Sequence, residues 1–231
     1  MQGAVIPAAA VTEDDKRAMF ALMSEFYDNM DEAVFRRDFA EKDHCLILRD
    51  DAGAVVGFTT QKVMAVEADG RTVHGVFSGD TIIHRDYWGQ TDLYRIFAQF
   101  WFEYAKQYDE FYWFLICKGY KTYCILPLVW AEFYPTFRAE TPPEMQRIID
   151  AYASALYPDE YNPATGVIEY RHTKDKLKAG VAEIDERRLR NKDIAYFCQA
   201  NPHHTEGFDI ACIAKFDASA VKPRMAAMLG I

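Results

Sequence analysis

Two features of the chain combine residue types that can do chemistry. Asp80 stands inside a run of apolar and β-branched residues, 73–83, that predicts a strand. A carboxylate in such a strand needs a reason: it either takes up a proton in a reaction or accepts hydrogen bonds from a neighbouring loop. The second feature is the polar and aromatic segment 84–91, which joins this strand to a helix beginning at Asp92. A loop that leads into a helix N-terminus favours an anion.

The elements that position these residues follow from the hydrophobic pattern. Thr12 and the three acidic residues after it predict the start of a helix, and a short second helix is expected over Glu32–Ala40. Turns with glycine then separate three apolar runs, which predict three consecutive antiparallel strands. These strands are expected at residues 45–48, 54–66 and 73–83.

A strongly amphipathic helix is expected over residues 92–108, because its apolar side chains recur at steps of three and four. The compact apolar run 111–117 after it predicts a buried strand. A right-handed crossover would make this strand parallel to the strand 73–83, giving a mixed sheet flanked by helices, an α/β (α+β) fold. Further elements are expected as partial helix within 118–137 ending near Pro135, helix at 141–156, strand at 166–170, helices at 183–190 and 192–198, and strand at 208–216.

Length and composition limit the classes of protein that the chain can belong to. Its 231 residues, half of them hydrophobic, predict a single-domain protein with a core over residues 1–140 and an extension over 141–231 on the same sheet. The net charge of −9 argues against a nucleic-acid partner. Five scattered cysteines without a CxxC pair predict neither a disulfide framework nor a metal site. No apolar run is long enough to span a membrane, so a cytoplasmic protein is expected.

Three segments of the chain resemble the GNAT (Gcn5-related N-acetyltransferase) superfamily. They are the hairpin 51–58, the strand and loop 78–91, and the sequence Phe133-Tyr134-Pro135. Together with the order of elements, the resemblance covers about the first 140 residues. It implies a GNAT-like fold with a C-terminal extension, and a donor that is acyl-CoA or the phosphopantetheine of an acyl carrier protein. It implies no metal, and an acceptor that is an amine on a small molecule, an amino acid or a peptide.

The resemblance also implies which residues hold the donor. The family loop R/Q-x-x-G-x-G/A matches residues 86–91, where Gly89 is kept, Asp86 replaces the first residue and Thr91 the last. Glycines in such a loop let backbone amides approach phosphates. The backbone of the preceding strand from Thr81 onward is expected to pair with the pantetheine. The predicted donor-binding residues are Ile82, Ile83, His84, Arg85, Trp88, Gly89, Gln90 and Thr91.

Catalysis in the family is direct attack of an amine on a thioester, helped by a base and often by a tyrosine acid. The resemblance implies Asp80 as the base, with Glu132 and His84 as competing candidates. Tyr134, in a sequence similar to F-Y-x-x-x-G-F, is the implied acid.

The leading hypothesis is an N-acyltransferase. Aromatic residues make up 15% of the chain, which is enough for a packed core or for an apolar cavity that holds an acyl group longer than acetyl. A non-catalytic module that has lost the donor loop and a thioester-using lactone-type synthase stay open as alternatives. The strand 208–216 is expected to leave an open edge for a homodimer.

Overall fold

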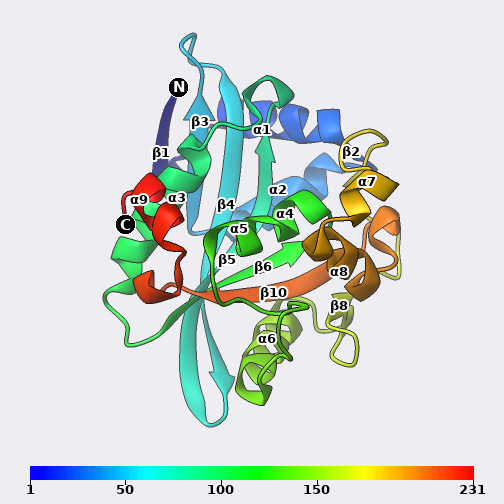
Figure 1. Ribbon diagram of the computed structural model, residues 1–231. Coiled ribbons are helices and arrows are strands. Elements are labelled where there is room, and N and C mark those ends of the chain that lie inside the picture. Colours follow the sequence, from blue (N-terminus) through cyan, green and yellow to red (C-terminus); the bar gives the residue numbers. More distant parts are fainter.

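The computed structural model describes residues 1–231 and is built around one eight-stranded mixed sheet (Figure 1). All neighbouring strands are antiparallel except β5 and β6, which are parallel. Across the sheet the order is β1 (Gln2–Pro7), β3 (His44–Arg49), β4 (Val55–Ala68), β5 (Arg71–Ile83), β6 (Phe111–Cys117), β10 (Asp209–Lys215), β8 (Val167–Ile168) and β7 (Tyr161–Asn162). A small second sheet pairs β2 (Tyr27–Asp28) with β9 (Lys176–Leu177).

Helices cover both faces of the large sheet. Strand β6 shows why: its residues are almost all buried, and they alternate between two apolar clusters, Trp113 and Leu115 on one face and Tyr112 and Phe114 on the other. One face packs against α1 (Glu13–Phe26), α2 (Glu32–Ala40) and α6 (Pro143–Leu156). The other packs against α3 (Asp92–Ala105), α4 (Tyr120–Tyr123), α5 (Ile125–Val129), α8 (Lys192–Ala200) and α9 (Pro223–Leu229).

The elements expected from the first half of the sequence are confirmed. Thr12 caps α1, because its hydroxyl accepts a hydrogen bond from the amide of Asp15 at 3.1 Å. The three antiparallel strands are β3, β4 and β5, and α3 crosses over from β5 to the parallel strand β6. The predicted fold class, a mixed sheet flanked by helices, is therefore confirmed. Strand β1, which pairs with β3 along its whole length, was not predicted.

The residues after 140 add strands to the same sheet. Strand β10 pairs with β6 on one side and with β8 on the other, so it lies inside the sheet. The expectation that β10 leaves an open edge for a dimer is wrong, because β1 and β7 are the edge strands. In Figure 1 the C-terminal helix α9 lies beside α3, which it contacts.

The segment 118–137 also differs from the prediction. Helical structure within 118–137 is confined to α4 and α5 and ends at Val129, whereas it was expected to continue to Pro135. Trp130 is already extended, and Tyr134 forms an isolated bridge to Ile213 of β10.

The remaining short helix is α7 (Glu186–Leu189), all of whose residues are exposed. None of the helices combines the length and the apolar character that crossing a membrane requires.

Candidate functional site

The parallel strands β5 and β6 separate before either of them ends. Their pairing runs from His74 opposite Phe111 to Ser78 opposite Leu115, but β5 continues to Ile83. At the last paired position the buried indole of Trp113 donates a hydrogen bond of 2.7 Å to the hydroxyl of Ser78. Beyond it, β5 stays paired with β4 and β6 stays paired with β10. The two strands therefore form a split in the middle of the sheet.

A bulge in β5 lies at the start of the split. Between the pairs Thr59–Thr81 and Gln61–Ser78, β5 has one residue more than β4, so Gly79 and Asp80 share the extra space. The two threonine hydroxyls lie 2.8 Å apart and tie the strands together just beyond the bulge. Asp80 lines the cavity at the split but makes no hydrogen bond or ion pair. Burial raises the pKa of Asp80, and nearby Lys42 offsets part of that effect.

The backbone of β5 beyond the bulge offers free hydrogen-bonding groups to the split. The amide of His84 bonds to the carbonyl of Val56 on β4. Because residues of an antiparallel strand alternate in direction, Ile83 and Thr81 turn their amides and carbonyls the other way. The indole of Trp88 donates to the carbonyl of Ile83 from that side, at 2.9 Å. The amide of Ile83 and both backbone groups of Thr81 thus face the split.

The start of α3 adds further free donors. Thr91 precedes the helix but its side chain caps no amide, and the amides of Asp92, Leu93 and Tyr94 meet no acceptor within the protein. Gly89, two residues earlier, has a left-handed φ of +90° and open space around it. The carboxylate of Asp92 is bound by Arg95 at 2.8 Å, and that of Asp86 is 76% exposed. Neither acid therefore blocks an anion from the helix start.

Two cavities meet at the split. The outer one, with about 1000 Å³ of empty space including its open mouth, is lined by Ile82, Ile83 and the loop residues Trp88, Gly89 and Gln90. The inner one, with about 1200 Å³ on the same measure, reaches Asp80 and both faces of the sheet. Five residues line both cavities, so the two adjoin: Tyr27, Thr81, Tyr94, Thr122 and Ile125.

One part of the inner cavity is charged. Lys118, which follows β6, bonds to Asp209 at 2.9 Å and to the carbonyl of Gly207 at 2.6 Å. The Tyr170 hydroxyl also donates to Asp209, at 3.0 Å. Lys174 and Asp175 form an ion pair of 3.0 Å. Apart from Lys118, these groups come from β10 and from the segment before β9, so the extension builds most of this wall of the cavity.

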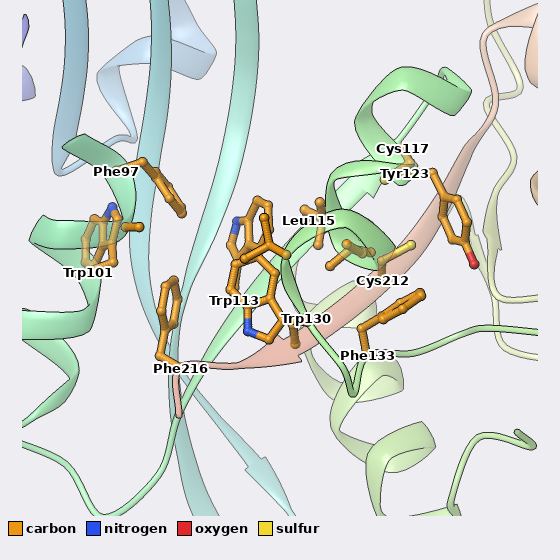
Figure 2. Close-up of a cluster of buried hydrophobic side chains, with 14 of the residues drawn as sticks. Phe97, Trp101, Trp113, Leu115, Cys117, Tyr123, Trp130, Phe133, Cys212 and Phe216 are labelled. Atoms are coloured by element: carbon orange, nitrogen blue, oxygen red, sulfur yellow. The ribbon is translucent and has the colours of Figure 1, made fainter. Parts of the chain in front are cut away.

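The opposite part of the inner cavity is apolar. Figure 2 shows Phe97 of α3, Trp113 of β6 and Trp130 turned toward one another. The ring centroids of Phe97 and Trp113 are 5.3 Å apart, and those of Trp113 and Trp130 are 5.0 Å apart. The remaining apolar lining on this side consists of Leu93, Ala98, Leu115, Ile125, Val129 and Leu229.

Of the three base candidates, the structure brings only Asp80 to the cavities. Glu132 is exposed and bonds to the Tyr134 hydroxyl at 3.1 Å. His84 lies beside Asp86 and Glu25, with its ring nitrogens 3.7 Å from each carboxylate. Tyr134 lines neither cavity, since its backbone is bonded to Ile213 on the far side of β6.

The predicted donor-binding residues are largely brought together. Ile82, Ile83, Trp88, Gly89 and Gln90 line the outer cavity. The other three lie at its border without lining it. Arg85 lies over the ring of Phe26, which does line the cavity, Thr91 precedes α3, and His84 ends the strand.

Sequence reasoning missed several lining residues. Lys121 lies over the Trp88 ring, with its Nζ 3.6 Å from the centroid, and puts a cation at the mouth of the outer cavity. Tyr27, Lys42 and Asp175 reach the inner cavity from short strands and connecting segments. Lys118 and Asp209 could have been recognised from the sequence, because each is a charged residue at the end of a buried apolar run. No group of His, Cys, Asp and Glu side chains is arranged to hold a metal ion.

Comparison with known proteins gives matches to solved structures alone, since no protein-family model and no curated protein matches the chain. A probable N-acyltransferase of unknown function from Enterococcus faecalis has 13% identity and a TM-score of 0.43 over 58% of this chain and 33% of that one. A GNAT family N-acetyltransferase from Escherichia coli, solved in complex with CoA, has 14% identity and a TM-score of 0.38 over 53% and 65%. N-myristoyltransferase from Saccharomyces cerevisiae, solved with bound myristoyl-CoA, has 10% identity and a TM-score of 0.39 over 50% and 31%.

The matched region spans about a third of the length of the Enterococcus faecalis protein and less than two thirds of the length of the other two. The chemistry open to this chain therefore depends on its own cavities and side chains.

Replacing Asp80 by Asn is expected to raise the Tm at neutral pH. Because burial raises the pKa of Asp80, the folded chain binds this proton more tightly than the unfolded chain and loses stability as the pH rises through the native pKa. Asn carries no charge to desolvate. The difference in Tm between variant and wild type should therefore be near zero at about pH 4, grow as the pH rises through the native pKa of Asp80, and then level off.

Asp175→Asn is the matched control for this thermal unfolding series. Burial alone would raise the pKa of Asp175, but Lys118 and Lys174 lower it by more. The ionised carboxylate therefore stabilises the fold at neutral pH, and this stabilisation is lost as the pH falls through the native pKa of Asp175. This variant should have a lower Tm than wild type at neutral pH. If Asp80→Asn also had a lower Tm than wild type at neutral pH, Asp80 would have a stabilising partner, contrary to our description of it as an isolated carboxylate.

Proposed function

We propose that the protein is an N-acyltransferase that moves an acyl group from a pantetheine thioester to an amine. The observation that carries the proposal is the pair of adjoining cavities along the split, which bring the free amides of α3 and the isolated carboxylate of Asp80 to the same region. A long, thin donor with phosphate at one end and a thioester at the other fits such a space. The acceptor amine reaches the thioester from the charged side.

The outer cavity suits the phosphate and pantetheine parts of the donor. Free amides at the start of a fourteen-residue helix favour an anion, and Lys121 adds a positive charge at the mouth. The amide groups of pantetheine can pair with the free backbone of Thr81 and Ile83. Acyl-CoA and an acylated carrier protein both present this arm, and we take acyl-CoA as the donor to test first.

Asp80 is the proposed general base. Burial raises the pKa of Asp80, which makes its carboxylate a stronger base for the proton that the amine loses. The amine nitrogen attacks the carbonyl carbon of the thioester and forms the new C–N bond. Asp80 takes the proton that the amine loses, and the C–S bond breaks to release a thiolate.

Tyr27 is the proposed acid that protonates the thiolate. It lines both cavities, and burial together with Asp175, Asp209 and Asp80 raises the pKa of its hydroxyl. The hydroxyl therefore keeps its proton at neutral pH, so it is available to donate a hydrogen bond, and then the proton, to the departing sulfur. Tyr94 also lines both cavities, but only burial raises its pKa, which indicates a position away from the carboxylates.

The apolar side of the inner cavity is proposed to hold the acyl chain. Its walls come from α3, α5, β6 and α9, and its aromatic lining would be in contact with a chain longer than acetyl.

Gly89→Glu is expected to abolish binding of acyl-CoA. Its side chain would add bulk and negative charge beside the free amides of α3, where the donor phosphates are proposed to bind. Gly53→Glu is the control, because Gly53 has a similar φ of +84° and equally open surroundings, but lies in the turn between β3 and β4. Thermal shift on titration with acyl-CoA measures the effect. No shift with the wild type, and none with acylated carrier protein, would overturn the proposed function.

Tyr27→Phe should lower kcat at least tenfold without weakening donor binding, because only proton donation to the thiolate is lost. Tyr134→Phe tests the tyrosine that the sequence favoured, and it should keep wild-type kcat because Tyr134 lines neither cavity. Release of free thiol in the presence of an amine measures both rates. A large loss of kcat in Tyr134→Phe with little loss in Tyr27→Phe would instead identify Tyr134 as the acid.

A panel of acyl-CoAs from acetyl to palmitoyl should give its highest kcat/KM with an acyl chain longer than acetyl. Ala98→Leu should shift that optimum to shorter chains, because Ala98 of α3 lines the apolar side of the cavity. Ala105→Leu is the control: Ala105 is buried on the same helix and lines neither cavity. A clear preference of the wild type for acetyl would rule out the long-chain donor and leave acyl transfer standing.

A further inference from the structure

Most of the charged side chains that line the inner cavity are neutralised by a partner. Lys118 is paired with Asp209, and Lys174 with Asp175. Asp38, near the cavity rim, has the guanidinium of Arg37 at 3.8 Å. Two opposite charges are left over, Lys42 and Asp80, which make neither an ion pair nor a hydrogen bond and do not contact each other.

Lys42 and Asp80 lie at the same point of the split. Lys42 comes from the segment between α2 and β3 and reaches across to the bulge of β5. A Cβ atom placed on Gly79 would be 3.0 Å from the Cε atom of Lys42 and 3.6 Å from its Nζ atom. Gly79 precedes Asp80 directly, so the missing side chain leaves the room that the ammonium group occupies.

The surroundings of Lys42 do not compensate its charge. Its Nζ atom lies 5.7 Å from the centroid of the Phe77 ring, which is a weak substitute for an anion. Burial lowers the pKa of Lys42, whereas Asp80, Asp38 and Glu41 act in the opposite direction with smaller effects, and none of the three forms an ion pair with its ammonium group. An unpaired ammonium and an unpaired carboxylate in one half-enclosed space are both poorly solvated, and a ligand with the complementary charges would relieve both.

We propose that the acceptor is an amino acid, whose ammonium group binds at Asp80 and whose carboxylate binds at Lys42. This inference rests on the proposed acyl transfer and names the substrate class of the same site. The ammonium group first gives one proton to Asp80, which releases it to solvent at the open side of the cavity. The amine then attacks the thioester carbonyl, Asp80 takes up the second proton as the C–N bond forms, and Lys42 holds the carboxylate on the side of Phe77. The product is an N-acyl amino acid, and the other product is the free thiol.

The test compares three acceptors that differ in one group. The twenty common amino acids are first assayed with the best acyl-CoA by thiol release. The preferred one is then compared with its decarboxylated amine and with its carboxamide, which stands in for a peptide N-terminus. The wild type should use the amino acid with a kcat/KM at least about tenfold higher than either analogue, since an ion pair with a half-buried lysine is lost in both.

Lys42→Met should remove this preference. The KM for the amino acid should rise about tenfold, whereas the rate with the decarboxylated amine and the binding of acyl-CoA should stay unchanged. Lys42→Arg keeps the positive charge and should restore part of the preference. Lys62→Met is the control, because Lys62 also carries a cation near this end of the sheet but is paired with Glu41 outside the cavity.

The outcomes separate this inference from the proposed function. Equal use of the amino acid and its decarboxylated amine by the wild type, or an equal loss with both acceptors in Lys42→Met, overturns the amino-acid acceptor and leaves acyl transfer in place. Absence of thiol release with every amine, together with absence of acyl-CoA binding, overturns the proposed function and this inference with it.

Discussion

The early end of the pairing between β5 and β6 is the constraint on which the site depends. Two parallel strands with unpaired edges inside a core would leave backbone groups unsatisfied, which costs free energy. Each strand keeps its other partner, β4 for β5 and β10 for β6, so both remain ordered while they separate. The hydrogen bond from Trp113 to Ser78 fixes where the separation begins. The backbone groups that remain free line a space that a substrate with amide groups can fill.

The charged side chains beside the split are of two kinds: some are paired with each other within the protein, and others are free to bind a substrate. Lys118 follows the end of β6 and Asp209 begins β10, and the two are paired with each other and bonded to the carbonyl of Gly207 and the hydroxyl of Tyr170. Removing one of them would leave a buried charge without a partner. Asp80 has no such partner, because the bulge moves it out of the regular pairing with β4. A destabilising group that persists next to a cavity is the pattern expected of a residue kept for chemistry.

The sequence predicted those parts of the molecule that follow from local patterns. The strands β3 to β6 and helix α3 have clear hydrophobic periodicity, and the position of Asp80 inside a strand was visible directly. Partners that depend on long-range pairing were not visible. Strands β2 and β9 have two residues each, yet their pairing brings Tyr27 and the segment around Asp175 over the cavity. The position of Tyr134 was not visible either, because similarity to a motif carries no information about its bridge to Ile213 of β10.

The loop 86–91 matches the GNAT loop pattern only at Gly89. The way in which the donor is proposed to bind gives a physical explanation for this weak match. Most of the proposed contacts to the donor come from backbone groups, namely the amides at the start of α3 and the free edge of β5. Backbone recognition requires a glycine where φ is positive, which Gly89 supplies, and places few demands on the side chains around it. Asp86 is therefore tolerated because it points to solvent, and Asp92 because Arg95 neutralises it. The acceptor, by contrast, is proposed to be bound by side chains, so its specificity depends on single residues such as Lys42 that no loop motif contains.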